Sequence, residues 1–113
     1  MCSAARRRPR EQRVDLGQLQ RTIAATYGEQ DRARGVEGTF AWFVEEVGEL
    51  SRAIRREGPE RRLEEFSDVL AWLVTLADMT GVDLAEAARR YADGCPKCGA
   101  SPCRCAETDP TRP

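Results

Sequence analysis

Six acidic side chains lie in two short segments whose spacing could assemble a metal site. The segments are FVEEVGEL, at residues 43–50, and EEFSD, at residues 64–68. The chain contains no histidine, so a metal site in it must use carboxylates or thiolates. Carboxylate oxygens are hard ligands that suit Mg²⁺ or Mn²⁺. The acidic residues are Glu45, Glu46, Glu49, Glu64, Glu65 and Asp68.

Helices through these segments would sort the acids onto different faces, because each helical residue advances by roughly 100°. In the first, Glu46 and Glu49 share a stripe with Trp42, whereas Glu45 lies further towards solvent. In the second, the stripe consists of Glu65, Asp68 and Trp72. Beside these stripes run two apolar ones, the predicted core faces: Phe43, Val47, Leu50 and Ile54, then Phe66, Leu70, Leu73 and Ala77.

A turn at Gly58-Pro59 predicts that the two helices form an antiparallel hairpin, since glycine commonly ends a helix and proline begins one. The acidic stripes then lie level, and gathered carboxylates repel unless a cation neutralises them. The facing pairs are Glu49 with Glu65, Glu46 with Asp68, and Trp42 with Trp72.

The alternative is a solvated, salt-bridged surface, because charge runs on helices usually face water. Spacing alone leaves the two interpretations evenly balanced. The arginines that could pair with the acids are Arg52, Arg55, Arg56, Arg61 and Arg62.

The rest of the chain also reads as all-α, without strand-like alternation. Asp15 is the expected N-cap of a helix over 16–33, and Thr39 that of the helix over 40–57, after a loop at 34–38. The third helix is expected over 59–80. Asp83 would cap a short fourth helix that ends near Tyr91.

The length of 113 residues predicts one small domain. We expect a disordered basic arm (1–14), a helical domain (15–94), a cysteine cluster (95–105) and a disordered tail (106–113). No apolar run approaches the ~20 residues that span a bilayer, and no apolar stretch follows the N-terminal arginines as in a signal peptide. The expected location is the cytoplasm, with no membrane partner.

The two acidic segments resemble the MazG-like all-α nucleoside triphosphate pyrophosphohydrolases. That family has an ExxE motif on one helix and an ExxD motif on the next, here Glu46–Glu49 and Glu65–Asp68. The resemblance covers about residues 15–94 and implies a four-helix MazG-like bundle around the hairpin of 40–57 and 59–80.

The resemblance implies Mg²⁺-dependent hydrolysis of a nucleoside triphosphate to a monophosphate and pyrophosphate. The two motifs would hold one or more Mg²⁺ ions. Glu45 would orient the attacking water or bind a further ion, although a solvent-facing acid is an equal alternative. Gly48 would allow a close approach to the helix backbone, by a ligand or by another helix.

Substrate contacts are harder to place. Trp42 and Trp72 could stack on the base, although tryptophans at such positions more often belong to the core. The arginines that could hold phosphates are Arg55, Arg56, Arg89 and Arg90, none of which stands out in so arginine-rich a chain. The resemblance also implies a homodimer or homotetramer.

A separate motif, CPKCGASPCRC, follows the last predicted helix. Its four thiolates could complete a closed tetrahedral Zn²⁺ site with a structural role. Disulfides or free redox-active thiols are the alternatives. Cys2 stands apart and is expected to be a free surface thiol. The four cysteines are Cys95, Cys98, Cys103 and Cys105.

Two other functions compete with the leading hypothesis. One is phosphoribosyl-ATP pyrophosphohydrolase, which the EEVGE form and the cysteine tail disfavour. The other is a nucleic-acid-binding or adaptor module built from the RRRPR arm and a zinc knuckle. The arm lacks interleaved aromatic residues and the pI is about 5.6, so the sequence argues against nucleic acid as the partner.

Overall fold

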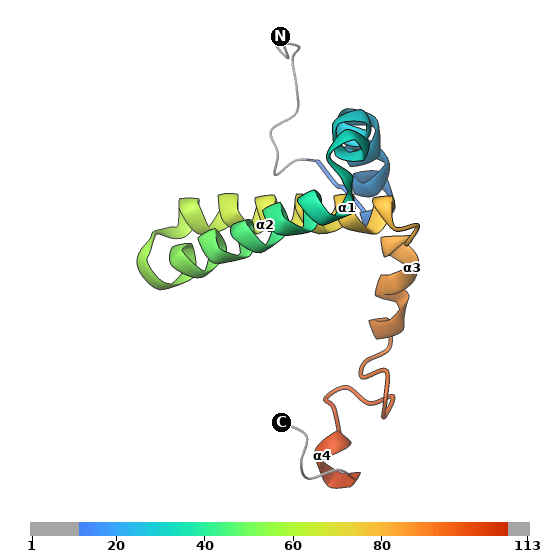
Figure 1. Ribbon diagram of the computed structural model, residues 1–113. Coiled ribbons are helices and arrows are strands. Elements are labelled where there is room, and N and C mark those ends of the chain that lie inside the picture. Colours follow the sequence, from blue (N-terminus) through green and yellow to red (C-terminus); the bar gives the residue numbers. More distant parts are fainter. Residues whose placement is uncertain (1–11, 109–113) are drawn as a thin grey trace.

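A long helical hairpin dominates the structure, a computed structural model that describes residues 12–108 (Figure 1). The elements are α1 (Leu16–Arg56), α2 (Pro59–Met79), α3 (Leu84–Ala88), the 3₁₀ turn η2 (Arg89–Tyr91) and α4 (Cys105–Thr108). No strand is present among the described residues, so the all-α prediction is confirmed. No described helix has both the length and the apolar character needed to cross a membrane.

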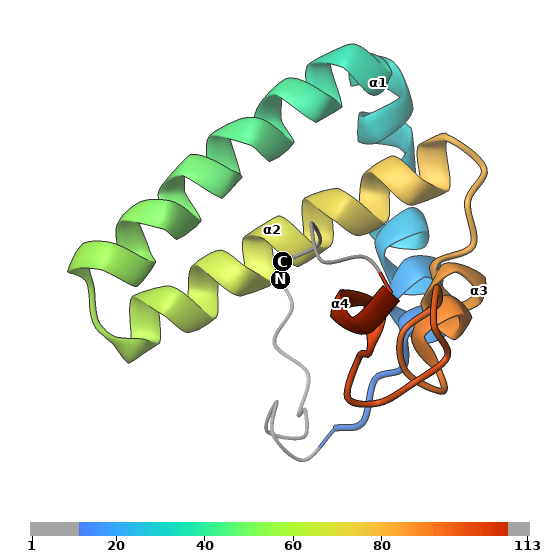
Figure 2. The ribbon, with the colours of Figure 1, turned by 90° about the horizontal axis from the view of Figure 1, so that it is seen from below.

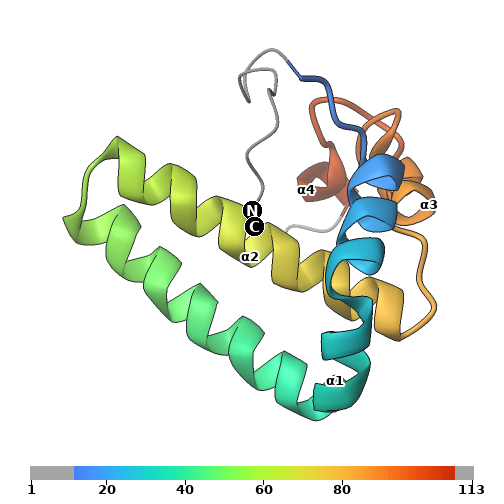
Figure 3. The ribbon, with the colours of Figure 1, turned by 90° about the horizontal axis from the view of Figure 1, so that it is seen from above.

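The second half of α1 runs antiparallel beside α2, and the first half of α1 turns away near the other end of α2 (Figures 2 and 3). Gly58 is the N-cap of α2 and Pro59 its first residue, so the predicted turn is confirmed. Asp15 caps α1 in a reciprocal capping box with Gln18, and the Asp83 carboxylate accepts from the backbone N–H groups that open α3.

The break predicted at residues 34–38 is present but much shorter. Only Gly35 leaves the helical conformation, with φ 85° and ψ 166°, a region that is essentially confined to glycine. Thr39 is not an N-cap: it is buried inside the helix, and its hydroxyl donates to the carbonyl of Gly35 at 2.7 Å. A single glycine bends the chain, so no loop is needed.

Gly35 and Gly48 make a matched pair for a stability measurement. Gly35→Ala is expected to lower the free energy of unfolding by about 1–3 kcal/mol, because alanine is strained at that φ and ψ. Gly48→Ala is expected to be neutral or to stabilise by up to about 1 kcal/mol, since nothing lies within 4 Å of the added carbon. Urea unfolding of both variants checks this. A strong loss for Gly48→Ala would indicate a second chain packed against it.

The predicted core stripes are wrong for this chain. On α1, Phe43 and Leu50 are half-buried, and Val47 and Ile54 are exposed. On α2 only Ala77 is buried. The exposed members of the two stripes have 42–55% of their surface accessible. A two-helix hairpin covers one side of each helix. Glu65 of the acidic stripe lies on that side and is buried, whereas Asp68 and Trp42 are exposed. The buried residues with accessibility below a tenth include Thr39, Ala53, Glu65, Val74, Thr75 and Ala77.

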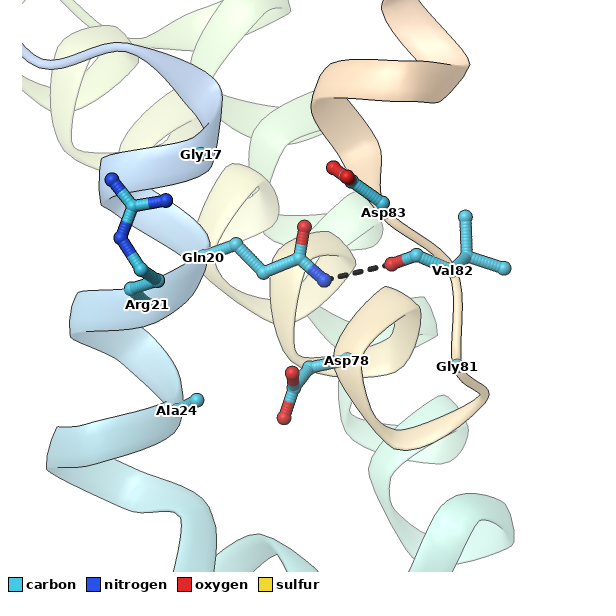
Figure 4. Close-up of a pocket in the computed structure, with 8 residues that line it drawn as sticks. All are labelled: Gly17, Gln20, Arg21, Ala24, Asp78, Gly81, Val82 and Asp83. Carbon is cyan, nitrogen blue, oxygen red and sulfur yellow. Dashed lines mark hydrogen bonds between the residues drawn. The ribbon is translucent and has the colours of Figure 1, made fainter.

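Gln20 ties the start of α1 to the segment before α3. Its Nε2 donates to the carbonyl of Val82 at 2.7 Å, and its Oε1 accepts from the N–H of Leu84 at 2.9 Å. Figure 4 shows this side chain in the cavity of about 370 Å³ between Arg21 and Asp83. These bonds fix the first half of α1 against the end of the hairpin.

The boundaries of the tail differ slightly from the prediction. Residues 105–108 are helical, so a disordered tail does not begin at residue 106. Residues 12–14 have no helix or strand. The rest of that arm, with Cys2, and the last residues of the tail lie outside the described residues.

Candidate metal centre and nucleotide cleft

Three of the predicted metal ligands converge between the two helices of the hairpin. Glu46 on α1 and Glu65 and Asp68 on α2 each offer an oxygen, and these oxygens all lie within 4.8 Å of one another. Glu65 and Asp68 share a face because they are three residues apart in a helix. The hairpin register places Glu46 opposite them, and we call this group the acidic cluster.

Glu65 is the most enclosed member of the acidic cluster, with only 4% of its surface exposed. Its Oε1 accepts from Nη2 of Arg61 at 2.8 Å. Its Oε2 is buried and has no hydrogen-bond partner. Burying a carboxylate oxygen without a partner is unfavourable. A cation with oxygen preference would satisfy this atom, so the residues present fit a hard divalent ion.

The electrostatics of Glu46 point the same way. Burial raises the pKa of this carboxyl above its usual range, and the negative charges of Asp68 and Glu65 raise it further. Each of these causes disfavours the ionised form of Glu46 while no cation is present. A bound divalent cation would reverse the sign of the local field.

The other two acids of the first segment lie outside the acidic cluster. Glu49 is half-buried and forms a loose ion pair with Arg52, at 3.9 Å between Oε2 and Nη1. Glu45 is exposed. Arg61 also contacts Glu57 and Glu64 through its guanidinium. The hairpin therefore has salt bridges of the kind that the surface alternative required, together with one buried acid, Glu65, which that alternative did not predict.

Arg61 positions Glu65, so its removal is expected to weaken metal binding without touching a ligand. Loss of an outer hydrogen bond to a ligand typically lowers metal affinity ~10–100-fold. We expect Arg61→Met to raise the Mg²⁺ concentration for half-maximal activity by about that factor, as measured by Mg²⁺ titration. Glu64→Gln is the control: it removes another partner of Arg61 and leaves the Arg61–Glu65 bond in place. Equal effects of the two variants would contradict a positioning role.

A cleft of about 320 Å³ opens beside the acidic cluster and shares Asp68 with it. Trp72 lines this cleft and stacks on Trp42, with ring centroids 6.3 Å apart and planes 12° from parallel. The predicted pairing of the two tryptophans is thus confirmed. The remaining residues that line the cleft are Ile23, Tyr27, Gln30, Asp31, Arg34, Ala71 and Thr75.

Arg34 is the arginine of this cleft, and the sequence analysis missed it. Its guanidinium donates twice to Oδ1 of the buried Asp31, at 2.8 and 3.0 Å. It also lies 4.9 Å from the centroid of the Trp72 ring, a distance at which a cation attracts an aromatic face. The one available signal was its position directly before the glycine that bends α1.

The four arginines predicted to bind phosphate are not among the residues that line this cleft. Arg55 and Arg56 are exposed in the last turn of α1, about 14–15 Å along the helix axis from Glu46 at 1.5 Å per residue. Arg89 and Arg90 lie in η2, where Arg90 stacks over Tyr91 at 5.8 Å.

Comparison with known proteins decides the family. The sequence profile of the MazG nucleotide pyrophosphohydrolase domain matches residues 34–96, more than half of the chain. The chain belongs to the MazG nucleotide pyrophosphohydrolase family. The match includes the whole acidic cluster, both tryptophans and Arg34, whereas the start of α1 with Tyr27 and Asp31 lies before it.

One relative of this MazG-family protein is named for its enzymatic activity. It is a dATP/dGTP diphosphohydrolase of cyanophage S-2L, 38% identical over 74 residues that make up 66% of this chain and 67% of the phage protein. The family and this relative identify the chain as a hydrolase of the nucleotide pyrophosphohydrolase class. Between the hypotheses drawn from the sequence, they favour the enzyme over the adaptor module.

Proposed function

We propose that the protein is a Mg²⁺-dependent nucleoside triphosphate pyrophosphohydrolase, which cleaves between the α- and β-phosphates to give a monophosphate and pyrophosphate. The observation that supports it most is the acidic cluster, in which Glu46, Glu65 and Asp68 converge and Oε2 of Glu65 is buried without a hydrogen-bond partner. The predicted roles of Glu49, as a further ligand, and of Glu45, as the water-orienting acid, remain part of the proposal.

Hydrolysis of a triphosphate requires neutralisation of the negative charge on its phosphate oxygens. When bound, Mg²⁺ neutralises charge on phosphate oxygens and lowers the pKa of water. The chain's own contribution is to hold the ligand oxygens within a few ångströms, with Arg61 fixing Glu65. The cysteines of the tail have no role in hydrolysis here, since four thiolates would close the coordination shell of a zinc ion.

The cleft supports a purine deoxynucleoside triphosphate as the substrate. It adjoins the acidic cluster through Asp68, so a base in the cleft would leave the phosphates near the metal ligands. Trp72 and Tyr27 line the cleft with aromatic side chains, and Asp31 contributes a buried carboxylate that is paired with Arg34. The S-2L relative is named for dATP and dGTP, both of which have purine bases. Trp42 would act through its stack on Trp72.

A panel of canonical and modified triphosphates tests the proposal, with pyrophosphate and orthophosphate measured separately. We expect stoichiometric pyrophosphate and monophosphate from at least one purine deoxynucleotide in Mg²⁺ or Mn²⁺, and none in EDTA. Release of orthophosphate instead, or no turnover of any nucleotide, would refute the assigned reaction. A preference for pyrimidines would leave the reaction standing and overturn the purine assignment.

The exposed apolar side chains of the hairpin support a homodimer or homotetramer. On each helix they are three, four or seven residues apart, so they form one stripe. A monomer rarely exposes so many large apolar groups together. Sedimentation of the purified protein checks this, and a monomer at micromolar concentration would contradict it. The side chains are Phe40, Val44, Val47 and Ile54 on α1, and Leu63, Phe66, Leu70 and Leu73 on α2.

A further inference from the structure

The four cysteines after α3 form a second group of potential metal ligands, distant in sequence from the acidic cluster. The sulfurs of Cys95, Cys98, Cys103 and Cys105 all lie within 4.8 Å of one another. The family match ends at residue 96, so three of the four lie beyond it. The family match therefore assigns no function to these four cysteines, which we call the thiolate cluster.

The sulfur separations match a tetrahedral ion. Sγ of Cys95 lies 3.5 Å from Sγ of Cys105, and Sγ of Cys98 lies 3.9 Å from Sγ of Cys103. A Zn–S bond of ~2.3 Å gives sulfur–sulfur edges of roughly 3.8 Å in a regular tetrahedron. A disulfide needs about 2.05 Å, so neither pair is bonded. The spacing suits four thiolates around one cation.

Backbone N–H groups point at the sulfurs and favour their ionised form. The N–H of Lys97 donates to Cys95 at 3.4 Å, that of Arg104 to Cys98 at 3.2 Å, and that of Cys105 to Cys103 at 3.4 Å. Three of the four sulfurs thus accept a backbone hydrogen bond, as ligand thiolates can.

Two glycines, one directly before Cys95 and one directly after Cys98, allow the tight turns of the cysteine segment. Gly94 has φ 124°, and a Cβ there would lie 2.7 Å from the carbonyl oxygen of Ala100. Gly99 has φ 75°, and its N–H donates to the carbonyl of Cys95 at 2.7 Å. Both conformations strongly favour glycine. These turns reverse the chain, so that Cys95 and Cys98 face Cys103 and Cys105.

Apolar packing cannot account for this tight segment. Between residues 92 and 106 the only buried side chain is that of Cys105, itself a member of the thiolate cluster. Chain segments this short seldom hold one conformation without a metal or a disulfide, and the sulfur distances exclude the disulfide. Metal binding can supply the missing folding free energy.

We propose that the thiolate cluster binds one Zn²⁺ as a closed, four-coordinate structural site, and that this ion folds residues 94–105 behind α3. Zinc prefers thiolate ligands in tetrahedral geometry. With all four positions taken by sulfur, no site remains for water or substrate. The ion has no part in hydrolysis, and the proposal does not depend on the proposed function.

Metal analysis of the full chain, purified in reducing buffer, tests the proposal. We expect about one zinc per chain, released together with four titratable thiols when a mercurial reagent is added. Cys98→Ser and Cys103→Ser are expected to lose most of the zinc. Cys2→Ser, the matched control outside the cluster, should retain it. Less than half an equivalent of zinc, or iron in its place, would overturn the proposal.

Limited proteolysis provides the second measurement and needs no variant. In wild-type protein treated with a strong chelator, new cleavage is expected within residues 94–105 while the hairpin stays intact, and added Zn²⁺ should restore protection. Unchanged protection after complete removal of zinc would overturn the folding role. Glu65→Gln should keep its zinc, so a failed hydrolysis assay and a failed zinc site are distinguishable.

Discussion

Replacing Glu65 with glutamine is expected to remove nearly all Mg²⁺-dependent pyrophosphate release. The glutamine amide keeps the size of the side chain but removes the charge of the carboxylate, whose Oε2 has no hydrogen-bond partner. Stabilisation of phosphate charge by a divalent cation contributes several kcal/mol, and each 1.36 kcal/mol is tenfold in rate. We therefore expect kcat/KM to fall by on the order of 10²–10³, as measured by pyrophosphate release at saturating Mg²⁺.

Glu60→Gln is the matched control, since Glu60 is exposed on the same helix and outside the acidic cluster. It should retain activity close to that of the wild type. Thermal unfolding of both variants separates a lost ligand from a lost fold. If folded Glu65→Gln keeps wild-type turnover and Mg²⁺ dependence, the assignment of the acidic cluster as the metal centre is wrong.

The same assay tests the proposed roles of Glu49 and Glu45, the two acids that lie outside the acidic cluster. Glu49 is held near the cluster by the helix and pairs only loosely with Arg52, so a metal ion could draw it in. Glu45 is exposed. If Glu45 orients the attacking water, Glu45→Gln lowers kcat and leaves the Mg²⁺ requirement unchanged. A variant with wild-type kcat would return Glu45 to the role of a solvent-facing acid.

The acidic cluster could be predicted because its geometry depends on few quantities. Helical spacing places Glu65 and Asp68 on one face, and the Gly58-Pro59 turn fixes the register that brings Glu46 to them. The stack of Trp42 on Trp72 confirms that register independently. Local rules are sufficient where two regular helices meet through a short turn.

The burial pattern could not be predicted in the same way. Periodicity identifies an apolar stripe but not what covers it. In one chain the neighbouring helix buries Glu65 of the acidic stripe and leaves most of the apolar stripes exposed. Arg34 escaped notice for a related reason. Its contacts with Asp31 and Trp72 depend on the bend at Gly35. The sequence predicted a loop over residues 34–38, and an irregular loop gives no basis for predicting these contacts. Tertiary geometry, rather than residue type, distinguishes this arginine from the others.

Replacing Glu46 with glutamine is expected to abolish activity and yet stabilise the metal-free protein. The folded state raises the pKa of Glu46, chiefly through burial and the nearby charge of Asp68. Between the unfolded pKa and the raised folded one, the native state binds more protons than the unfolded state does. The stability of the metal-free protein therefore falls as the pH rises through that interval. A neutral glutamine removes this penalty.

Thermal unfolding in EDTA and in Mg²⁺ checks the sign. At pH 7 in EDTA, Glu46→Gln should melt at a higher temperature than the wild type. The difference should vanish below about pH 4.5, where a glutamate in its ordinary environment becomes protonated. Mg²⁺ should raise the melting temperature of the wild type by mass action and have little effect on the variant. Lower stability of Glu46→Gln in EDTA at pH 7 would show that Glu46 is not strained by its acidic neighbours. Greater metal-free stability together with lost activity would mean that the carboxylates of the acidic cluster destabilise the metal-free fold and are required for cation binding.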